Sequence, residues 1–152
     1  MMIKQNCFRC LQFIEVSRCL DLIDMTWLIF APNLSHLCVD DCNDIEKIIN
    51  LERLDGVGNV VQELNPFGKH TILILSSLPR LSSIHDKALP FLYLKEIKVL
   101  ACTALRKLPL NSTSAEGSNI VIRGHEYWWS SLEWKDEDAR NVFLPCFRRD
   151  IK

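Results

Sequence analysis

Residues 94–108 read LKEIKVLACTALRKL, and this stretch decides the fold because its apolar frame occurs three times in the chain. Residues 11–25 (LQFIEVSRCLDLIDM) and 34–48 (LSHLCVDDCNDIEKI) follow the same pattern, L-x-x-[LI]-x-V-x-x-C-x-x-[LI]-x-x-[LIM]. A degenerate fourth copy at residues 70–84 begins with His70 and carries Leu78 where the other copies have cysteine. Such self-similarity indicates a repeat architecture, in which stacked units bury a continuous core that one unit could not form alone.

The spacing of the copies is typical of leucine-rich repeats. The cysteine position, whose side chain is expected to turn inward between stacked coils, recurs at Cys19, Cys42, Leu78 and Cys102. Successive copies therefore lie 23, 36 and 24 residues apart. Two of these spacings fall within the range of about 20–29 residues for such repeats. The longer interval predicts an insertion near residues 50–65, where turn-forming residues gather. An aromatic residue precedes each copy by three or four positions and is expected to fill the convex half of its coil: Phe8, Phe30, Phe67 and Phe91.

The predicted fold is an α/β solenoid, a short irregular leucine-rich-repeat stack with a parallel β-sheet on the concave face and a C-terminal cap. Residues 1–110 hold about four repeats, and residues 111–152 hold a last strand at 120–122 and an aromatic cap with a helical turn or two within 133–142. Trp128, Trp129 and Trp134 either plug the end of the stack or form an exposed aromatic patch. The alternative fold, an α/β domain with fortuitous leucines, would require six positions to match in three copies by chance.

Composition excludes several functional classes. The chain has 152 residues, 48% of them hydrophobic and 24% charged, as expected for one folded domain. Its formal net charge of −1 provides no basic field for nucleic acid. Its apolar runs are too short for a transmembrane segment, and it starts without the apolar stretch of a signal peptide. The seven cysteines are odd in number, so a disulfide framework is not expected, and the predicted location is cytoplasmic.

The sequence predicts no catalytic, metal-binding or cofactor-binding residues, and hence no enzyme. Cys7, Cys10 and Cys19 suggest zinc, but no further cysteine or histidine pair follows closely to complete four ligands. The four histidines are dispersed over different copies, and a triad assembled in space stays open as an alternative. No G-x-S-x-G nucleophile motif is present.

Strand alternation predicts the binding surface, because framework residues point inward and the intervening residues point outward. Cys38 is expected on the concave face and Cys42 in the core. Ile72 and Ile74 are apolar where solvated strands usually carry polar residues, and they either anchor a protein partner or reflect register drift in the degenerate copy. The predicted protein-binding residues are Glu15, His36, Asp40, Ile72, Ile74, Glu96, Lys98, Leu100 and Arg123.

Several longer motifs resemble a known family. Residues 26–34 (TWLIFAPNL) and 105–112 (LRKLPLNS) are joined by 89–91 (LPF), 94–97 (LKEI) and the tryptophans of the cap. Together they resemble the C-terminal leucine-rich-repeat region of plant coiled-coil nucleotide-binding disease resistance proteins, from about Phe8 to about Phe147. His70 and the degenerate copy depart from the family's pattern. No G-x-x-x-x-G-K-[ST] loop occurs, so the chain itself is not expected to bind nucleotide or to switch.

The resemblance implies a protein-interaction module of plant defence. In such receptors the repeats contribute to recognition of a pathogen effector or a guarded host protein, and they restrain the nucleotide-binding switch. The expected partners are an effector, a guarded host protein or a nucleotide-binding domain, with no nucleic acid and no cofactor. The alternative hypothesis is a truncated structural remnant without recognition or signalling activity.

Overall fold

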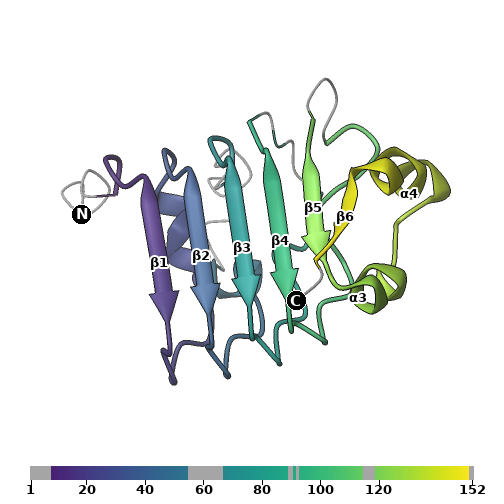
Figure 1. The fold of residues 1–152 in the computed structure, drawn as a ribbon. Helices are drawn as coiled ribbons and strands as arrows, with labels where there is room; N and C mark the ends of the chain where they lie inside the picture. The colour runs from purple at the N-terminus through teal and green to yellow at the C-terminus, as the bar shows by residue number, and fades with distance from the viewer. Residues whose placement is uncertain (1–7, 55–66, 89–90, 92, 115–118, 151–152) are drawn as a thin grey trace.

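The computed structural model of the protein describes residues 8–54, 67–88, 91, 93–114 and 119–150. Six parallel strands form one sheet in the order in which they occur along the chain (Figure 1). The strands are β1 (Phe13–Ser17), β2 (His36–Asp40), β3 (Ile72–Ser76), β4 (Glu96–Leu100), β5 (Val121–Gly124) and β6 (Phe147–Arg149). Each connection leaves the sheet and returns beside the strand it left, so every coil lies against the next. This architecture confirms the predicted leucine-rich-repeat solenoid.

The strands pair without any offset between repeats. Ile14, Leu37, Leu73 and Ile97 form one continuous inward row, and the next inward row begins with Val16 and Val39. The degenerate copy keeps this register, because Ile72 pairs with His36 on one side and with Glu96 on the other. The interpretation that Ile72 and Ile74 merely reflect register drift is therefore wrong. Strands β2, β3 and β4 share one pattern in which buried residues alternate with half-buried ones.

A left-handed residue ends each of the first four strands and turns the chain into the body. The four are Arg18 (φ 57°), Asp41 (φ 53°), Ser77 (φ 54°) and Ala101 (φ 52°). Three of them also link the coils, because the Arg18, Asp41 and Ser77 amides donate to the next strand's carbonyl over 2.9–3.0 Å. Because this turn directs the chain inward, the next residue, at the cysteine position of the repeat, is directed toward the body of the stack.

The expected burial at the cysteine position is confirmed for three of the four copies. Cys42, Leu78 and Cys102 are buried, and the Cys42 thiol donates to the Asp40 carbonyl at 3.4 Å. The prediction for Cys19 is wrong because this side chain is exposed. It belongs to the coil of β1, the edge strand of the sheet, and within the described residues no further coil covers it on that side.

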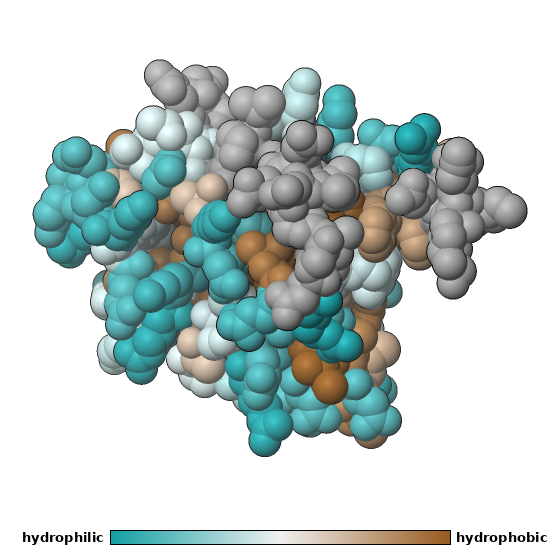
Figure 2. Space-filling model, turned by 180° about the vertical axis from the view of Figure 1, so that it is seen from behind, coloured by the Kyte–Doolittle hydropathy of each residue, from teal (hydrophilic) through white to brown (hydrophobic). Residues whose placement is uncertain are grey.

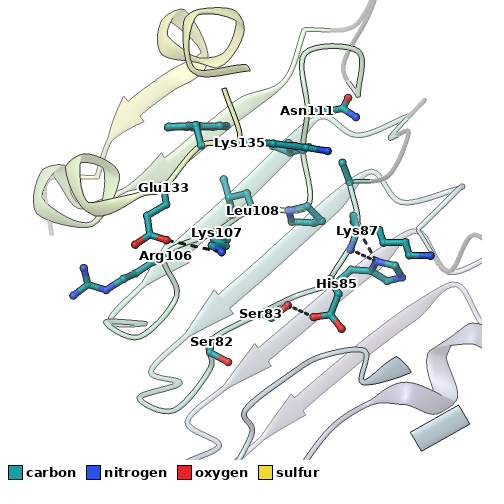
Figure 3. Close-up of a pocket in the computed structure, with 15 residues that line it drawn as sticks. Ser82, Ser83, His85, Lys87, Arg106, Lys107, Leu108, Asn111, Glu133 and Lys135 are labelled. Atoms are coloured by element: carbon teal, nitrogen blue, oxygen red, sulfur yellow. Dashed lines mark hydrogen bonds and ion pairs between the residues drawn. The ribbon is translucent and has the colours of Figure 1, made fainter. Parts of the chain in front are cut away.

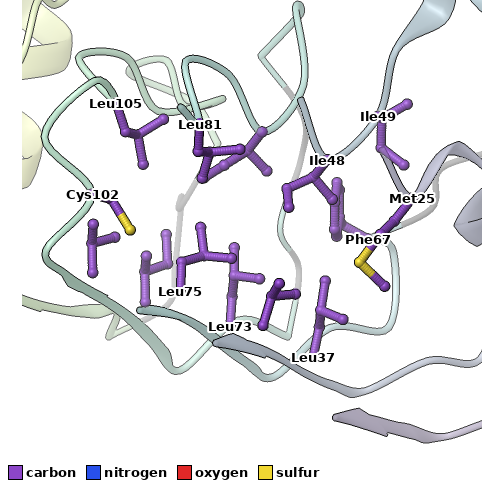
Figure 4. Close-up of a cluster of buried hydrophobic side chains, with 14 of the residues drawn as sticks. Met25, Leu37, Ile48, Ile49, Phe67, Leu73, Leu75, Leu81, Cys102 and Leu105 are labelled. Atoms are coloured by element: carbon purple, nitrogen blue, oxygen red, sulfur yellow. The ribbon is translucent and has the colours of Figure 1, made fainter. Parts of the chain in front are cut away.

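The apolar residues that follow the cysteine position in each copy, together with buried aromatic residues, fill the space between the sheet and the outer half of the coils (Figure 4). The Phe67 and Phe91 rings are fully buried with centroids 5.7 Å apart. The prediction for Phe30 is wrong, because its side chain is 37% exposed. The matching position in that coil is the buried Ala31, whose carbonyl accepts from Leu34 as the Phe67 carbonyl accepts from His70.

A short 3-10 helix replaces the missing aromatic ring in the second coil. This helix, η1 (Thr26–Phe30), buries Leu28 and Ile29 against the core. A second, η2 (Leu51–Leu54), lies at the start of the predicted insertion. Residues 55–66, which contain most of that insertion, lie outside the described residues.

His70 is the least expected member of the core. Its side chain is fully buried, and neither ring nitrogen has a hydrogen-bond partner. Its ring meets Phe67 edge-on with centroids 5.0 Å apart. Burial lowers the pKa of His70 from 6.5 to about 4, and the nearby His36 lowers it further in the same direction. The Leu34 backbone acts in the opposite sense. The ring is therefore neutral at pH 7.

The cap combines helices α3 (Glu126–Ser131) and α4 (Glu137–Phe143) with the 3-10 helix η3 (Leu144–Cys146). Trp128 is buried, and its Nε1 donates to the Leu105 carbonyl at 2.9 Å. Trp129 and Trp134 are half-buried and packed against the core, as the plug interpretation expects. These three tryptophan rings thus cover the last coil, and little of them remains for an exposed patch.

The sheet continues beyond the strand that the sequence predicts as the last. After the helices of the cap the chain returns as β6, and Phe147 pairs with Ile122. The ring of Phe147 stacks on Trp129 with centroids 4.5 Å apart. A three-residue strand that reads Phe-Arg-Arg has no apolar alternation, which is why the sequence does not reveal it.

Candidate protein-binding face

The outward side chains of β1 to β6 form one surface, which we call the strand face. Every residue of the predicted binding set lies on it: Glu15, His36, Asp40, Ile72, Ile74, Glu96, Lys98, Leu100 and Arg123. The zero-offset pairing arranges them in rows across the sheet, with neighbouring strands about 4.8 Å apart. The sequence therefore places these residues correctly on one surface, and their role in binding stays a prediction.

The centre of the strand face is apolar. Ile72 and Ile74 are both half-buried, and Ile74 pairs with Cys38 on β2 and with Lys98 on β4. An apolar group flanked by polar ones is the usual composition of a protein-binding hot spot. This centre is held rigidly, since β3 is hydrogen-bonded to a strand on both sides.

The half of the face toward β1 carries negative charge. Glu15 pairs with Cys38 across the β1–β2 boundary, and Asp40 lies two residues beyond Cys38 on the same side of β2. Burial raises the pKa of the Cys38 thiol, and the charges of Glu15 and Asp40 raise it further. Both carboxylates therefore act on the same point of the surface.

Aromatic rings border the same half of the face. Phe13 is 59% exposed, and its ring lies 5.8 Å from that of His36. The Ser35 hydroxyl is 2.9 Å from Nδ1 of His36 and holds the imidazole in place.

The half toward β6 carries both signs of charge in pairs. Nε of Arg123 lies 3.7 Å from a carboxylate oxygen of Glu96. Nζ of Lys98 lies 3.3 Å from a carboxylate oxygen of Asp150, just beyond β6. Sequence reasoning missed Asp150, because only the return of the chain as β6 brings this residue onto the strand face. Spacing along the chain carries no signal for that contact.

Comparison with known proteins identifies the family. Residues 1–116 match the family described as plant disease resistance protein RPS2-like, leucine-rich repeats. The chain belongs to this family. The repeats of residues 1–116 are thus leucine-rich repeats of the kind found in plant disease resistance proteins, as the resemblance in the sequence predicts.

Relatives of this repeat region come from Arabidopsis thaliana. The chain is 41% identical over 135 residues to "Probable disease resistance protein At5g63020", covering 89% of this chain and 15% of that protein. It is 42% identical over 145 residues to "Probable disease resistance protein At1g61310", covering 93% and 15%. It is 39% identical over 148 residues to "Disease resistance protein UNI", covering 95% and 16%.

This repeat region thus spans about one-sixth of the length of the relatives it matches. No solved structure matches it.

The opposite side of the repeat region carries hydrophilic residues interspersed with smaller hydrophobic areas (Figure 2). It contains a hollow of about 890 Å³ between the third and fourth coils and the segment before α4 (Figure 3). Of its charged residues, Lys107 reaches Glu133 at 4.0 Å and Asp86 reaches Lys47 outside the hollow at 3.6 Å.

Ser83, His85 and Asp86 lie together in this hollow, but their bonds differ from those of a hydrolase triad. The Ser83 hydroxyl donates to Asp86 at 3.4 Å, and Nδ1 of His85 accepts from the Lys87 amide at 3.1 Å. In a triad the serine would bond to the histidine and the histidine to the acid. Burial lowers the pKa of His85. The arrangement is that of a turn stabilised by side chains.

The cysteines provide no assembled ligand set in the part of the chain that the structure describes, where no group of three or more potential metal ligands is close together. Cys10 and Cys19 are exposed, and Cys7 of the zinc hypothesis lies outside the described residues. Within the described ranges, no helix has the length and apolar character needed to cross a bilayer.

Proposed function

We propose that this chain is a protein-recognition module of plant immunity that binds its partner through the strand face. The partner is a pathogen effector, a guarded host protein or the nucleotide-binding region of a receptor in the cytoplasm. The observation that carries the proposal is the apolar pair Ile72 and Ile74 at the centre of an uninterrupted strand surface. Similarity to disease resistance proteins over most of the chain supports the role in defence.

Recognition by such a surface needs no cofactor. The parallel strands fix each outward side chain at a set spacing, so the surface is preorganised and little conformational entropy is lost on binding. Restraint of a nucleotide-binding switch would follow if the strand face binds the inactive form of the nucleotide-binding region more tightly than the active form.

The test is a binding measurement between the whole chain and a separately expressed nucleotide-binding region of a receptor from this family. We expect Ile74→Asp to weaken binding at least tenfold, because it places a charge at the apolar centre. Val142→Asp is the matched control, since Val142 is a 41% exposed β-branched residue on α4 of the cap. Equal binding by the two variants would overturn the assignment of the strand face. Absence of binding to that region and to candidate effectors would favour the structural remnant.

A further inference from the structure

The charges on the strand face differ in one respect between its two halves: whether they already have partners. On the half toward β6, Lys98 is paired with Asp150 and Arg123 with Glu96. The Lys98 and Asp150 side chains are only 32% and 17% exposed, so this pair is partly shielded from water. An acidic group on a binding partner would have to displace Asp150 before it could pair with Lys98.

Arg148 is also engaged on that half. It pairs with Arg123 across the β5–β6 boundary, and its guanidinium donates to the carbonyls of Pro145 and Phe147 at 2.8 and 2.9 Å. Lys98, Arg123 and Arg148 therefore each have an acceptor within the chain already.

The carboxylates on the other half are in the opposite situation. Within the described residues, neither Glu15 nor Asp40 forms an ion pair. The two flank Cys38, whose pKa both of them raise, so their fields overlap above that side chain. A cationic group placed over Cys38 would meet two negative charges without displacing any group of the chain.

The site over Cys38 adjoins the apolar centre. Cys38 and Ile74 are direct partners across the β2–β3 boundary, and Ile72 lies two residues before Ile74 on the same face. Neighbouring strands are about 4.8 Å apart. A cationic and an apolar side chain on the same side of one partner segment, at i and i+2 of a strand or i and i+4 of a helix, span about 6–7 Å and can reach both places.

We propose that the strand face binds a protein segment that places a lysine or arginine between Glu15 and Asp40 and an adjacent aliphatic or aromatic side chain on Ile72 and Ile74. This inference rests on the proposed function and specifies the chemistry of its partner. Lys98 and Arg123 contribute less to affinity than the two carboxylates do, because their charges are compensated within the chain.

The test uses a random library of 12-residue peptides displayed on phage and selected against the whole folded chain. Peptides that depend on the strand face are those that bind the wild type and Val142→Asp but not Ile74→Asp. Their affinities are then measured against the double variant Glu15→Gln with Asp40→Asn and against Lys98→Gln. Both are near-isosteric changes on the sheet surface, and circular dichroism establishes that each variant keeps its fold.

The expected result is enrichment of lysine or arginine beside an aliphatic or aromatic residue in the peptides that depend on Ile74. The double variant should then bind these peptides about tenfold more weakly, and Lys98→Gln should change their affinity by less than about threefold. Binding to the wild type should also weaken between 50 and 500 mM salt.

Two results overturn the inference, and they have different meanings for the proposed function. Peptides that depend on Ile74 but are acidic or neutral, or that bind the double variant equally well, refute the partner chemistry alone. If no selected peptide depends on Ile74, the strand face itself is refuted as a binding surface, and the proposed function fails with it.

Discussion

Replacement of His70 by leucine should stabilise the protein, and by more at low pH than at neutral pH. His70 occupies the position that Leu11, Leu34 and Leu94 fill in the other copies. Its buried ring nitrogens lack hydrogen-bond partners, and an unsatisfied buried polar group costs about 1–3 kcal/mol. The lost edge contact with Phe67 offsets about 1 kcal/mol. We expect His70→Leu to raise the free energy of unfolding by about 1 kcal/mol at pH 7.

The pH dependence provides the sharper test. The pKa of His70 is 6.5 for the ordinary side chain and about 4 in the folded protein, so the unfolded state takes up the proton first as pH falls. The stability of the wild type is therefore fully present above pH 6.5 and is lost as the pH falls toward 4. Linkage sets this loss at about 2 kcal/mol between pH 7 and pH 5, with a limit of about 3 kcal/mol.

Urea unfolding of the wild type and His70→Leu at pH 7 and pH 5, followed by circular dichroism, measures both effects. Other titrating groups such as His85 are common to the two proteins, so their contributions cancel in the difference. We expect the advantage of His70→Leu to grow from about 1 to about 3 kcal/mol on acidification. An advantage that stays the same at both pH values would refute the neutral buried histidine. A destabilised variant would refute the argument from unsatisfied nitrogens.

Three further predictions concern the backbone of the stack. Gly124→Ala should lower the free energy of unfolding by about 2 kcal/mol, because the added Cβ would lie 2.6 Å from the ring of Trp128 and 3.0 Å from the Val99 carbonyl. An unchanged thermal midpoint would contradict this. Ala101→Gly should stabilise by about 0.5 kcal/mol in urea unfolding, because it relieves a left-handed φ of 52° at an exposed site, and a loss of stability would count against strain there. Amides of β1 should exchange with solvent faster than those of β4, since β1 is the edge strand; equal protection of the two strands would contradict this.

The core strands could be predicted from the sequence because their apolar frame recurs. Each inward position of β1 to β4 corresponds to a repeated leucine, isoleucine or valine, and the outward positions follow from the two-residue period of a strand. The register followed from the same repetition. One misplaced residue would have moved Ile72 and Ile74 into the core, and the structure keeps them outside.

The predictions from sequence failed for residues whose contacts depend on how the chain folds back in three dimensions. Phe30 is an aromatic residue one position away from the framework site, and the backbone turn at Ala31 decides which of the two is buried. Strand β6 forms because the helices of the cap carry Phe147 back to Ile122, which no local pattern encodes. For the same reason the pairing of Asp150 with Lys98, and hence the charge balance of the strand face, required the structure.

The thiol of Cys38 can report directly whether a partner binds across the strand face. Cys38 is half-buried beside the apolar centre of the face, whereas Cys19 is exposed in the turn after β1 and serves as an internal reference. The measurement is the rate of maleimide labelling of each cysteine, by mass spectrometry, with and without a saturating nucleotide-binding region or selected peptide. We predict that the partner slows labelling of Cys38 at least tenfold and leaves Cys19 unchanged. Labelling of Cys38 at its free rate in the presence of a bound partner would show that the partner binds elsewhere than on the strand face.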